Sequence, residues 1–203
     1  MIDTVIFDFG RVLAHYEPEE IVRKLWGEED LSLLADTIFR SPIWDALDAG
    51  SITNGEGIAM AKEQLPPHLH AAAERILTDW MTAMPPVLGM AELVADLRAS
   101  GRVSLYLLSN ISEHFAERHT LFPVLSLFDR LFFSGVLKLV KPSPAIFLHL
   151  LKEVGKRGEE CIFIDDNADN IRAAAALGIH TYLFDGDVAA LRRALSDVLS
   201  VEL

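Results

Sequence analysis

Short uncharged runs alternate along this chain with longer segments whose apolar residues recur at helical spacing. Residues 4–7 (Thr-Val-Ile-Phe) and 161–164 (Cys-Ile-Phe-Ile) are rich in β-branched and aromatic side chains. Such runs are typical of strands that are buried on both faces of a sheet. Residues 103–108, 131–133 and 181–184 have the same character. The pattern therefore predicts five strands.

Helices are predicted between these strands. The helical segments are 90–99, a segment that starts at Ser112, 145–154, an Ala-rich segment that Asn167 can cap and Gly178 ends, and 188–199. A regular alternation of strand and helix favours parallel strands joined by right-handed crossovers. The predicted fold class is α/β, with a Rossmann-like parallel sheet flanked by helices.

The alternation is interrupted after the first strand. Residues 15–85 show no strand pattern, and 17–26, 31–39, 57–64 and 69–84 have amphipathic helical spacing. Pro- and Gly-containing breaks are predicted at 41–42, 49–51, 54–55 and 66–67. We interpret this segment as an inserted all-helical cap domain, and 1–14 with 86–203 as the α/β core domain. Trp26, Phe39, Trp44 and Trp80 are interpreted as the core of the insertion rather than as a binding site.

Composition narrows the choice of partners and compartment. The formal charge is −12 and no Lys/Arg cluster offsets it, which argues against nucleic acid or an anionic membrane as a partner. Cys161 is the single cysteine, so no disulfide framework exists and a reducing compartment is expected. No apolar span is long enough to cross a bilayer, and no basic signal region precedes the first strand. We expect a cytoplasmic protein, either a monomer or a homodimer.

Polar side chains follow several of the predicted strands. Asp8 follows the first strand, Ser109 and Asn110 the second, and Asp165 and Asp166 the strand at 161–164, while Lys141 is placed at a helix start. The carboxyl ends of parallel strands share one edge of a sheet, where ligands bind.

The adjacent carboxylates of Asp165 and Asp166 repel each other, by about 1 kcal/mol at ~4 Å in water and roughly four times that near a protein surface. A shared cation explains them best, although a solvated turn that caps a helix would explain this stretch equally well if it stood alone. All-oxygen ligands suit Mg²⁺, and no Cys/His spacing suggests zinc. With an attacking carboxylate and an ammonium group, the set is suited to phosphoryl transfer.

Four motifs in order carry a family resemblance. They are Phe-Asp-x-Gly at 7–10, Leu-Leu-Ser-Asn at 107–110, Val-Lys-Pro at 140–142 and Phe-Ile-Asp-Asp-Asn-Ala-Asp-Asn-Ile at 163–171. The chain resembles the haloacid dehalogenase (HAD) superfamily, and most closely its branch of small phosphatases that includes α-glucose-1-phosphate phosphatase. Residues 44–53 also resemble the cap of that branch.

The resemblance implies a Mg²⁺-dependent phosphatase that acts on small phosphorylated metabolites, sugar phosphates above all, through an aspartyl-phosphate intermediate. It implies that Asp8 is the nucleophile and that Lys141 is catalytic, with Ser109, Asn110 and Lys141 holding the phosphate. The implied metal ligands are Asp8, the Gly10 carbonyl, Asp165 and Asp166. Asn170 would stand beside the metal ligands rather than among them.

Gly10 departs from the superfamily pattern. Most phosphatases of the superfamily have an Asp two residues after the nucleophile, which protonates the leaving group and later activates water. Positioned acid–base groups contribute roughly 10²–10⁴-fold, so the sequence predicts a preference for leaving groups that need little protonation. Arg11 and His15 follow closely. Arg11 could bind a substrate anion and His15 could supply a proton, but we interpret both as solvated or hinge residues.

Alternative functions remain open at this stage. A haloacid dehalogenase would need Asp8 but no metal, and the acid pair argues against it. A phosphometabolite-binding regulator with little or no activity would fit the loss of the acid–base group at Gly10. A receiver-like signalling domain does not suit the long helical insertion.

Overall fold

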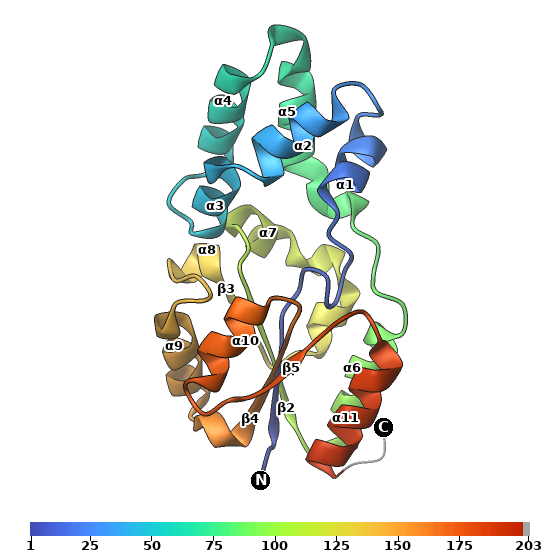
Figure 1. Ribbon diagram of the computed structural model, residues 1–203, viewed down its shortest axis with the longest axis vertical. Coiled ribbons are helices and arrows are strands. Elements are labelled where there is room, and N and C mark those ends of the chain that lie inside the picture. Colours follow the sequence, from blue (N-terminus) through green and yellow to red (C-terminus); the bar gives the residue numbers. More distant parts are fainter. Residues whose placement is uncertain (201–203) are drawn as a thin grey trace.

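Strand β1 (Thr4–Phe7) lies at the centre of a five-stranded parallel sheet with the order β3-β2-β1-β4-β5 (Figure 1). The computed structural model describes residues 1–200. The other strands are β2 (Ser104–Ser109), β3 (Arg130–Phe133), β4 (Cys161–Asp165) and β5 (His180–Leu183). Val5 pairs with Leu105 on one side and Ile162 on the other. The predicted fold class is confirmed, with β5 beginning one residue earlier than expected.

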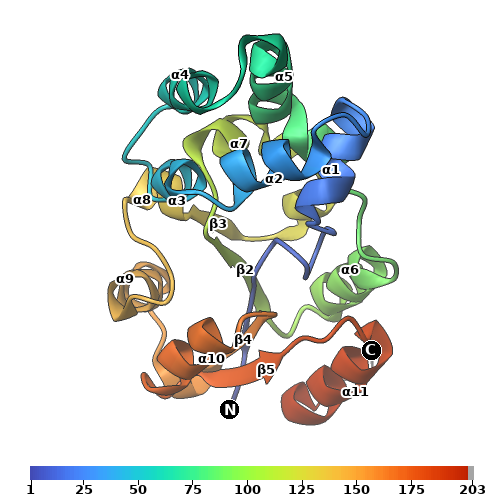
Figure 2. The same ribbon diagram turned by 45° about the horizontal axis from the view of Figure 1, so that its top comes forward.

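Helices cover both faces of the sheet. Helices α6 (Met90–Ser100) and α11 (Val188–Leu199) lie on one face, and α9 (Pro144–Val154) and α10 (Ala168–Ala175) lie on the other (Figure 2). Alternate residues of β1 pack into different clusters: Val5 and Phe7 belong to the first and Ile6 to the second. Each of these side chains is fully buried, which stabilises the fold by roughly 1.5–3 kcal/mol per side chain.

Two short helices lie close to the carboxyl end of the sheet. Helix α7 (Glu113–Arg118) is capped by Ser112, as predicted, whose Oγ accepts a hydrogen bond from Phe115 N at 3.4 Å. Helix α8 (Ser134–Leu137) begins directly after β3. Both contact the insertion: His114 of α7 hydrogen-bonds to the Thr78 carbonyl, and Ser134 of α8 donates to the Asp48 carbonyl.

The insertion consists of α1 (Pro18–Leu25), α2 (Leu31–Phe39), α3 (Pro42–Asp48), α4 (Asn54–Gln64) and α5 (His70–Asp79), with 3₁₀ turns at Pro67–Leu69 and Trp80–Ala83. These helices, which we call the helical cap, stand above the carboxyl end of the sheet (Figure 1). The single helix expected over 69–84 is therefore wrong, because α5 ends at Asp79 and a 3₁₀ turn follows. Within residues 1–200, no helix has the length and apolarity that a bilayer crossing requires.

Helix α3 was missed because it occupies the short stretch between two break signals. Ser41 acts as its N-cap, with Oγ accepting from Ile43 N at 3.2 Å, and Pro42 stands at its first position, where proline is tolerated. Its apolar side chains Ile43, Trp44 and Leu47 are buried. The packing of this face, rather than length, stabilises the helix.

Helix α4 starts earlier than the sequence suggested. Thr53 and Glu56 form a capping box: Thr53 Oγ1 accepts from Glu56 N at 3.2 Å, and the Glu56 carboxylate accepts from Thr53 N at 2.7 Å. The Asn-Gly pair at 54–55, predicted to be a break, therefore forms the first turn of the helix.

Candidate active site

Asp8 stands at the end of the central strand, where the carboxyl ends of β1, β2 and β4 meet. Its backbone N–H donates to the Ile164 carbonyl at 2.9 Å, which continues the pairing of β1 with β4. Its carboxylate Oδ1 lies 2.8 Å from Lys141 Nζ, and the same Nζ lies 2.7 Å from Asp165 Oδ2. Lys141 is 4% exposed and Asp165 0%. Three groups from distant parts of the sequence therefore form one buried ion-pair cluster.

The backbone of Lys141 is fixed by the side chain of Asn110. Asn110 Nδ2 donates to the Lys141 carbonyl, and Asn110 Oδ1 accepts from Lys141 N, both at 2.8 Å. Lys141 lies in the turn before α9, whose first residue is Pro144, so the expected position at a helix start is wrong. The amide of Asn110, expected to hold phosphate, is thus mainly engaged in holding Lys141.

Two effects act in opposite directions on the ammonium group. Burial alone would lower the pKa of Lys141, but the adjacent carboxylates of Asp8 and Asp165 raise it above its ordinary value. Lys141 Nζ also lies 5.3 Å from the centroid of the Phe163 ring, a favourable cation–π distance. The lysine therefore remains charged at neutral pH.

Asp165 is surrounded by hydrogen-bond donors. Its Oδ1 accepts from Asn167 N at 2.8 Å, and Asn170 Nδ2 lies 3.0 and 3.2 Å from its two oxygens. Burial raises the pKa of Asp165 to about 6, and the charge of Asp8 adds to this effect while Lys141 opposes it. Asn170 thus contacts Asp165 directly and stands where the sequence placed it, beside the acid pair.

Asp166 faces the open side of the cluster. Burial raises the pKa of its carboxyl group, the charge of Asp8 adds to the rise, and Arg11 opposes it. Arg11 Nη1 lies 3.9 Å from Asp166 Oδ2, and half of the Arg11 side chain is exposed. Arg11 is exposed, in keeping with its interpretation as a solvated residue, and it also lines the cavity. His15 is exposed and lines neighbouring grooves.

The three acidic residues fit a hard divalent cation. Carboxylate oxygens of Asp8, Asp165 and Asp166 all lie within 4.8 Å of one another, and oxygen ligands of this kind are those that Mg²⁺ prefers. Gly10, whose carbonyl is an expected ligand, lines the same cavity. Another set of possible ligands, Glu29, Asp30 and His68, is exposed on the helical cap.

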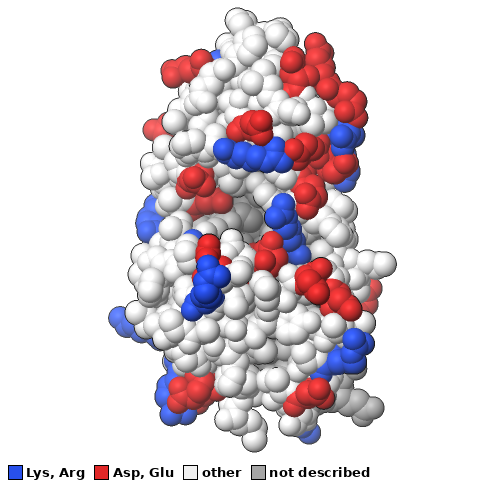
Figure 3. Space-filling view, viewed as in Figure 1, with Lys and Arg blue, Asp and Glu red and all other residues white. Residues whose placement is uncertain are grey.

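A cavity of about 210 Å³ lies over this cluster, between the core and the helical cap. Figure 3 shows the molecule hollowed at this level, with side chains of both charges around the opening. The core contributes Ser109 and Asn110 to the cavity, in addition to the charged cluster. The apolar wall of the cavity is formed by residues from both the core and the cap: Phe9, Tyr16, Trp44, Trp80, Met84 and Ile111.

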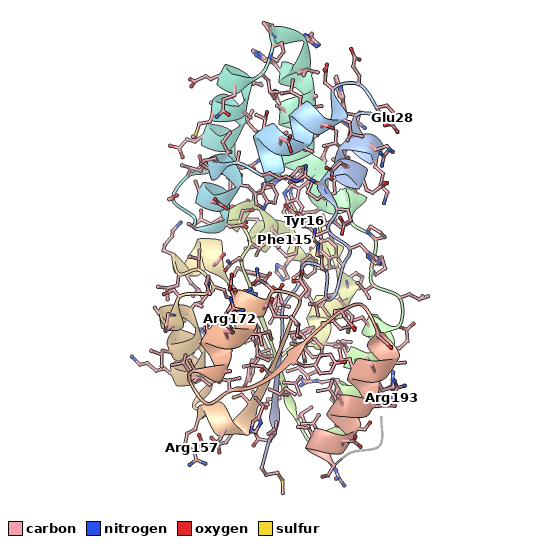
Figure 4. All side chains as sticks on the ribbon, in the orientation of Figure 1. Tyr16, Glu28, Phe115, Arg157, Arg172 and Arg193 are labelled. Atoms are coloured by element: carbon pink, nitrogen blue, oxygen red, sulfur yellow. The ribbon has the colours of Figure 1, made fainter. Side chains whose placement is uncertain are left out.

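The sequence analysis did not assign several residues of this wall to the site. Trp44 and Trp80 are buried, as expected of a core, with ring centroids 5.0 Å apart, but they also line the cavity. Tyr16 lies at the level where cap and core meet (Figure 4). Its ring centroid is 6.4 Å from that of Trp80, and burial raises its pKa. Asp48, the last residue of α3, is the acidic residue that the cap contributes to the cavity lining. Periodicity could not indicate which cap side chains face the core.

This fold and this arrangement of Asp8, Lys141 and the acid pair define a hydrolase of the HAD type. A family model of haloacid dehalogenase-like hydrolases matches residues 2–178. The chain belongs to this family.

Curated relatives include enzymes with different activities. A sesquiterpene phosphatase of Aspergillus oryzae is 30% identical over 86% of this chain and 85% of its own length. A D-ribitol-5-phosphate phosphatase of Bacteroides thetaiotaomicron is 26% identical over 90% of this chain and 91% of its own. A drimenol cyclase of Aspergillus calidoustus is 28% identical over 91% of this chain, which spans only 34% of that protein.

Solved structures share the fold. A predicted HAD-like family hydrolase from Porphyromonas gingivalis superposes with a TM-score of 0.74 at 25% identity, over 96% of this chain and 98% of that one. A HAD family enzyme from Bacteroides thetaiotaomicron, solved in complex with magnesium and inorganic phosphate, has a TM-score of 0.72 at 23% identity, over 94% of this chain and 99% of that one. The predicted family and fold are thus confirmed.

Proposed function

We propose that this protein is a Mg²⁺-dependent phosphatase that hydrolyses small phosphorylated metabolites through an aspartyl-phosphate intermediate on Asp8. The observation that carries the proposal is the position of the Asp8 carboxylate at the floor of the cavity, paired with Lys141 at 2.8 Å and beside the acid pair. A carboxylate nucleophile next to a cation and a metal site is suited to phosphoryl transfer.

In this proposal each residue has a distinct role. Asp8 attacks phosphorus with the oxygen that faces the cavity, while Lys141 and Ser109 hold phosphoryl oxygens and Asn110 orients Lys141. Bound by Asp8, Asp165, Asp166 and the Gly10 carbonyl, Mg²⁺ would offset the negative charge that a phosphate dianion brings to an acidic site. The helical cap, residues 15–85, would exclude bulk water from the reaction.

We propose a sugar phosphate as the first substrate to test, in keeping with the resemblance to the glucose-1-phosphate branch. The cavity volume of about 210 Å³ is below the roughly 300–1,000 Å³ that drug-sized ligands occupy, which supports a small substrate. The D-ribitol-5-phosphate phosphatase among the relatives also supports a polyol or sugar substrate.

The apolar wall of the cavity supports a second candidate substrate class, phosphate monoesters of apolar alcohols. Trp44, Trp80 and Met84 would contact such an alcohol through carbon atoms. The similarity to a sesquiterpene phosphatase points in the same direction. The two classes differ in whether the leaving alcohol needs hydrogen-bond partners in the cap.

Phosphate release from a panel of phosphorylated metabolites tests the proposal. The panel would include glucose 1-phosphate, ribitol 5-phosphate, a prenyl monophosphate and an aryl phosphate, each with Mg²⁺ and with EDTA. We expect Mg²⁺-dependent turnover that Asp8→Asn reduces by at least about a thousandfold, because the amide is not a nucleophile. Asp36→Asn, a substitution on the exposed surface of α2, serves as the matched control and should retain full activity.

Three other results would contradict the proposal. Halide release from 2-haloacids that persists in EDTA would indicate a dehalogenase. Binding of phosphosugars without turnover would indicate a regulator. Equal activity of the wild type and Asp8→Asn would remove Asp8 from the mechanism.

A further inference from the structure

Asp48 is the acidic residue that the helical cap contributes to the lining of the candidate active site. It ends α3 and lines the same cavity as Asp8 and Lys141. Among residues 1–200, its carboxylate forms no ion pair with a lysine or arginine, and its side chain is partly open to the cavity. A carboxyl group in this position faces the space where the leaving group of a substrate would lie.

The core holds the end of α3 in place through backbone contacts. Ser134 Oγ, at the start of α8, donates to the Asp48 carbonyl at 2.5 Å. Lys138 Nζ donates to the Gly50 carbonyl and also pairs with Glu113 at 2.8 Å. Because these contacts engage backbone carbonyl groups, they fix the helix end without engaging the Asp48 carboxyl group.

The surroundings of Asp48 favour its protonated form. Burial raises the pKa of this carboxyl group well above its ordinary value, the charges of Asp45 and Asp8 add to the rise, and Lys141 opposes it. The protonated form of a carboxyl group is the form that can act as a general acid.

The core itself provides no such group, because Gly10 stands where most phosphatases of the family place their acid–base Asp. The backbone at Gly10 is not in the left-handed region, and a Cβ placed there would have only Tyr16 Cβ, at 3.9 Å, as a neighbour within 4 Å. The absence of a side chain at this position is therefore not imposed by packing.

We propose that Asp48 is the general acid and base of the reaction, supplied by the cap in place of a residue at position 10. This inference rests on the proposed phosphatase function. When Asp8 attacks phosphorus, the ester P–O bond breaks, its electron pair stays on the leaving oxygen, and Asp48 transfers its proton to that oxygen. The Asp48 carboxylate then takes a proton from water as the water oxygen attacks phosphorus, which breaks the P–O bond to Asp8 and releases inorganic phosphate.

Two substrates of similar size and different leaving groups test this role. The 4-nitrophenolate ion leaves without protonation, whereas the benzyl alkoxide does not. For Asp48→Asn we expect kcat/KM to fall about 10²–10⁴-fold on benzyl phosphate but less than about tenfold on 4-nitrophenyl phosphate. Asp36→Asn, on the exposed surface of α2, is the matched control and should leave both values unchanged.

A rescue variant separates proton transfer from packing. On benzyl phosphate, the double variant Gly10→Asp/Asp48→Asn should have a kcat/KM at least about tenfold higher than that of Asp48→Asn alone. On 4-nitrophenyl phosphate, the two variants should differ little. Across substituted phenyl phosphates, kcat/KM of the wild type should depend weakly on leaving-group acidity, and that of Asp48→Asn steeply. This replaces the expectation from Gly10 alone that the wild type itself requires acidic leaving groups.

Equal losses on both substrates would overturn the inference, since they would show that Asp48 serves binding or folding. Full activity of Asp48→Asn on benzyl phosphate would overturn it as well. If the wild type hydrolyses none of these esters in the presence of Mg²⁺, the proposed phosphatase function fails and the inference with it. If the wild type does hydrolyse 4-nitrophenyl phosphate, the phosphatase function stands, and a failed Asp48 test then counts against the role of Asp48 alone.

Discussion

Lys141 Nζ lies between Asp8 Oδ1, at 2.8 Å, and Asp165 Oδ2, at 2.7 Å. One ammonium group thus balances two carboxylates that stand at the ends of neighbouring strands. Both distances are those of charge-assisted hydrogen bonds, and the side chains of Lys141 and Asp165 are almost completely buried. The cluster depends on this single positive charge.

Substitution of Lys141 by Met is expected to destabilise the protein by about 3–5 kcal/mol, because it leaves buried carboxylates without a partner. Urea unfolding measures the loss. The matched control is Lys62→Met, which breaks the exposed pair with Glu74 on the cap and should change stability far less. Equal losses in the free energy of unfolding would show that the buried ion pairs of Lys141 contribute no more to stability than an exposed pair does.

Magnesium is expected to stabilise the folded protein by mass action, by about 2.7 kcal/mol when free Mg²⁺ is about 100 times its Kd. The rise in melting temperature should disappear with EDTA and in Asp166→Asn, which removes a carboxylate from the candidate site. His68→Ala, in the exposed Glu29–Asp30–His68 group, is the control and should keep the full rise. A rise lost in His68→Ala and kept in Asp166→Asn would place the ion at the surface.

Gly50 is expected to tolerate no side chain. Its φ is +62°, and a Cβ there would overlap the Gly135 carbonyl oxygen of the core. Gly50→Ala should therefore cost about 1–3 kcal/mol and raise KM, since the end of α3 would move away from the core. Gly55→Ala, in the first turn of α4 with open space around it, should be neutral or stabilising by up to about 1 kcal/mol. Denaturant unfolding and steady-state kinetics of the two variants provide the test.

Asp48→Asn is expected to make the protein more stable at neutral pH. Because burial raises the pKa of Asp48 in the folded state, the unfolded chain loses this proton first. The contribution of Asp48 to stability is fully present below the unfolded pKa and falls as pH rises through the folded pKa. The gain in stability from Asp48→Asn should thus be near zero at pH 3 and grow toward neutral pH. A gain that does not change with pH would contradict this assignment.

The sheet and its ligand-binding edge could be predicted from the sequence because both follow from short-range signals. Uncharged runs predict buried strands, parallel strands place their carboxyl ends together, and Asp8, Asp165 and Asp166 each follow such a run directly. The parallel order of the strands is therefore enough to bring these three carboxylates together.

The cap side of the site could not be predicted in the same way. Which face of α3 meets the core depends on how five helices pack over residues 15–85, and no local periodicity specifies this. Asp48 therefore looked like any acidic residue before an Ala-Gly turn. The role of Asn110 was also hidden, because its hydrogen bonds to Lys141 join segments that are distant along the chain.

The central place of β1 has a consequence for how the protein is made. Its two neighbours in the sheet, β2 and β4, begin at Ser104 and Cys161, so a ribosome completes β1 long before either partner exists. Until then its backbone donors and acceptors form open edges, which invite wrong pairing. Phosphatase activity would therefore appear only late in translation, and chains that end before β4 should depend on chaperones to stay in solution.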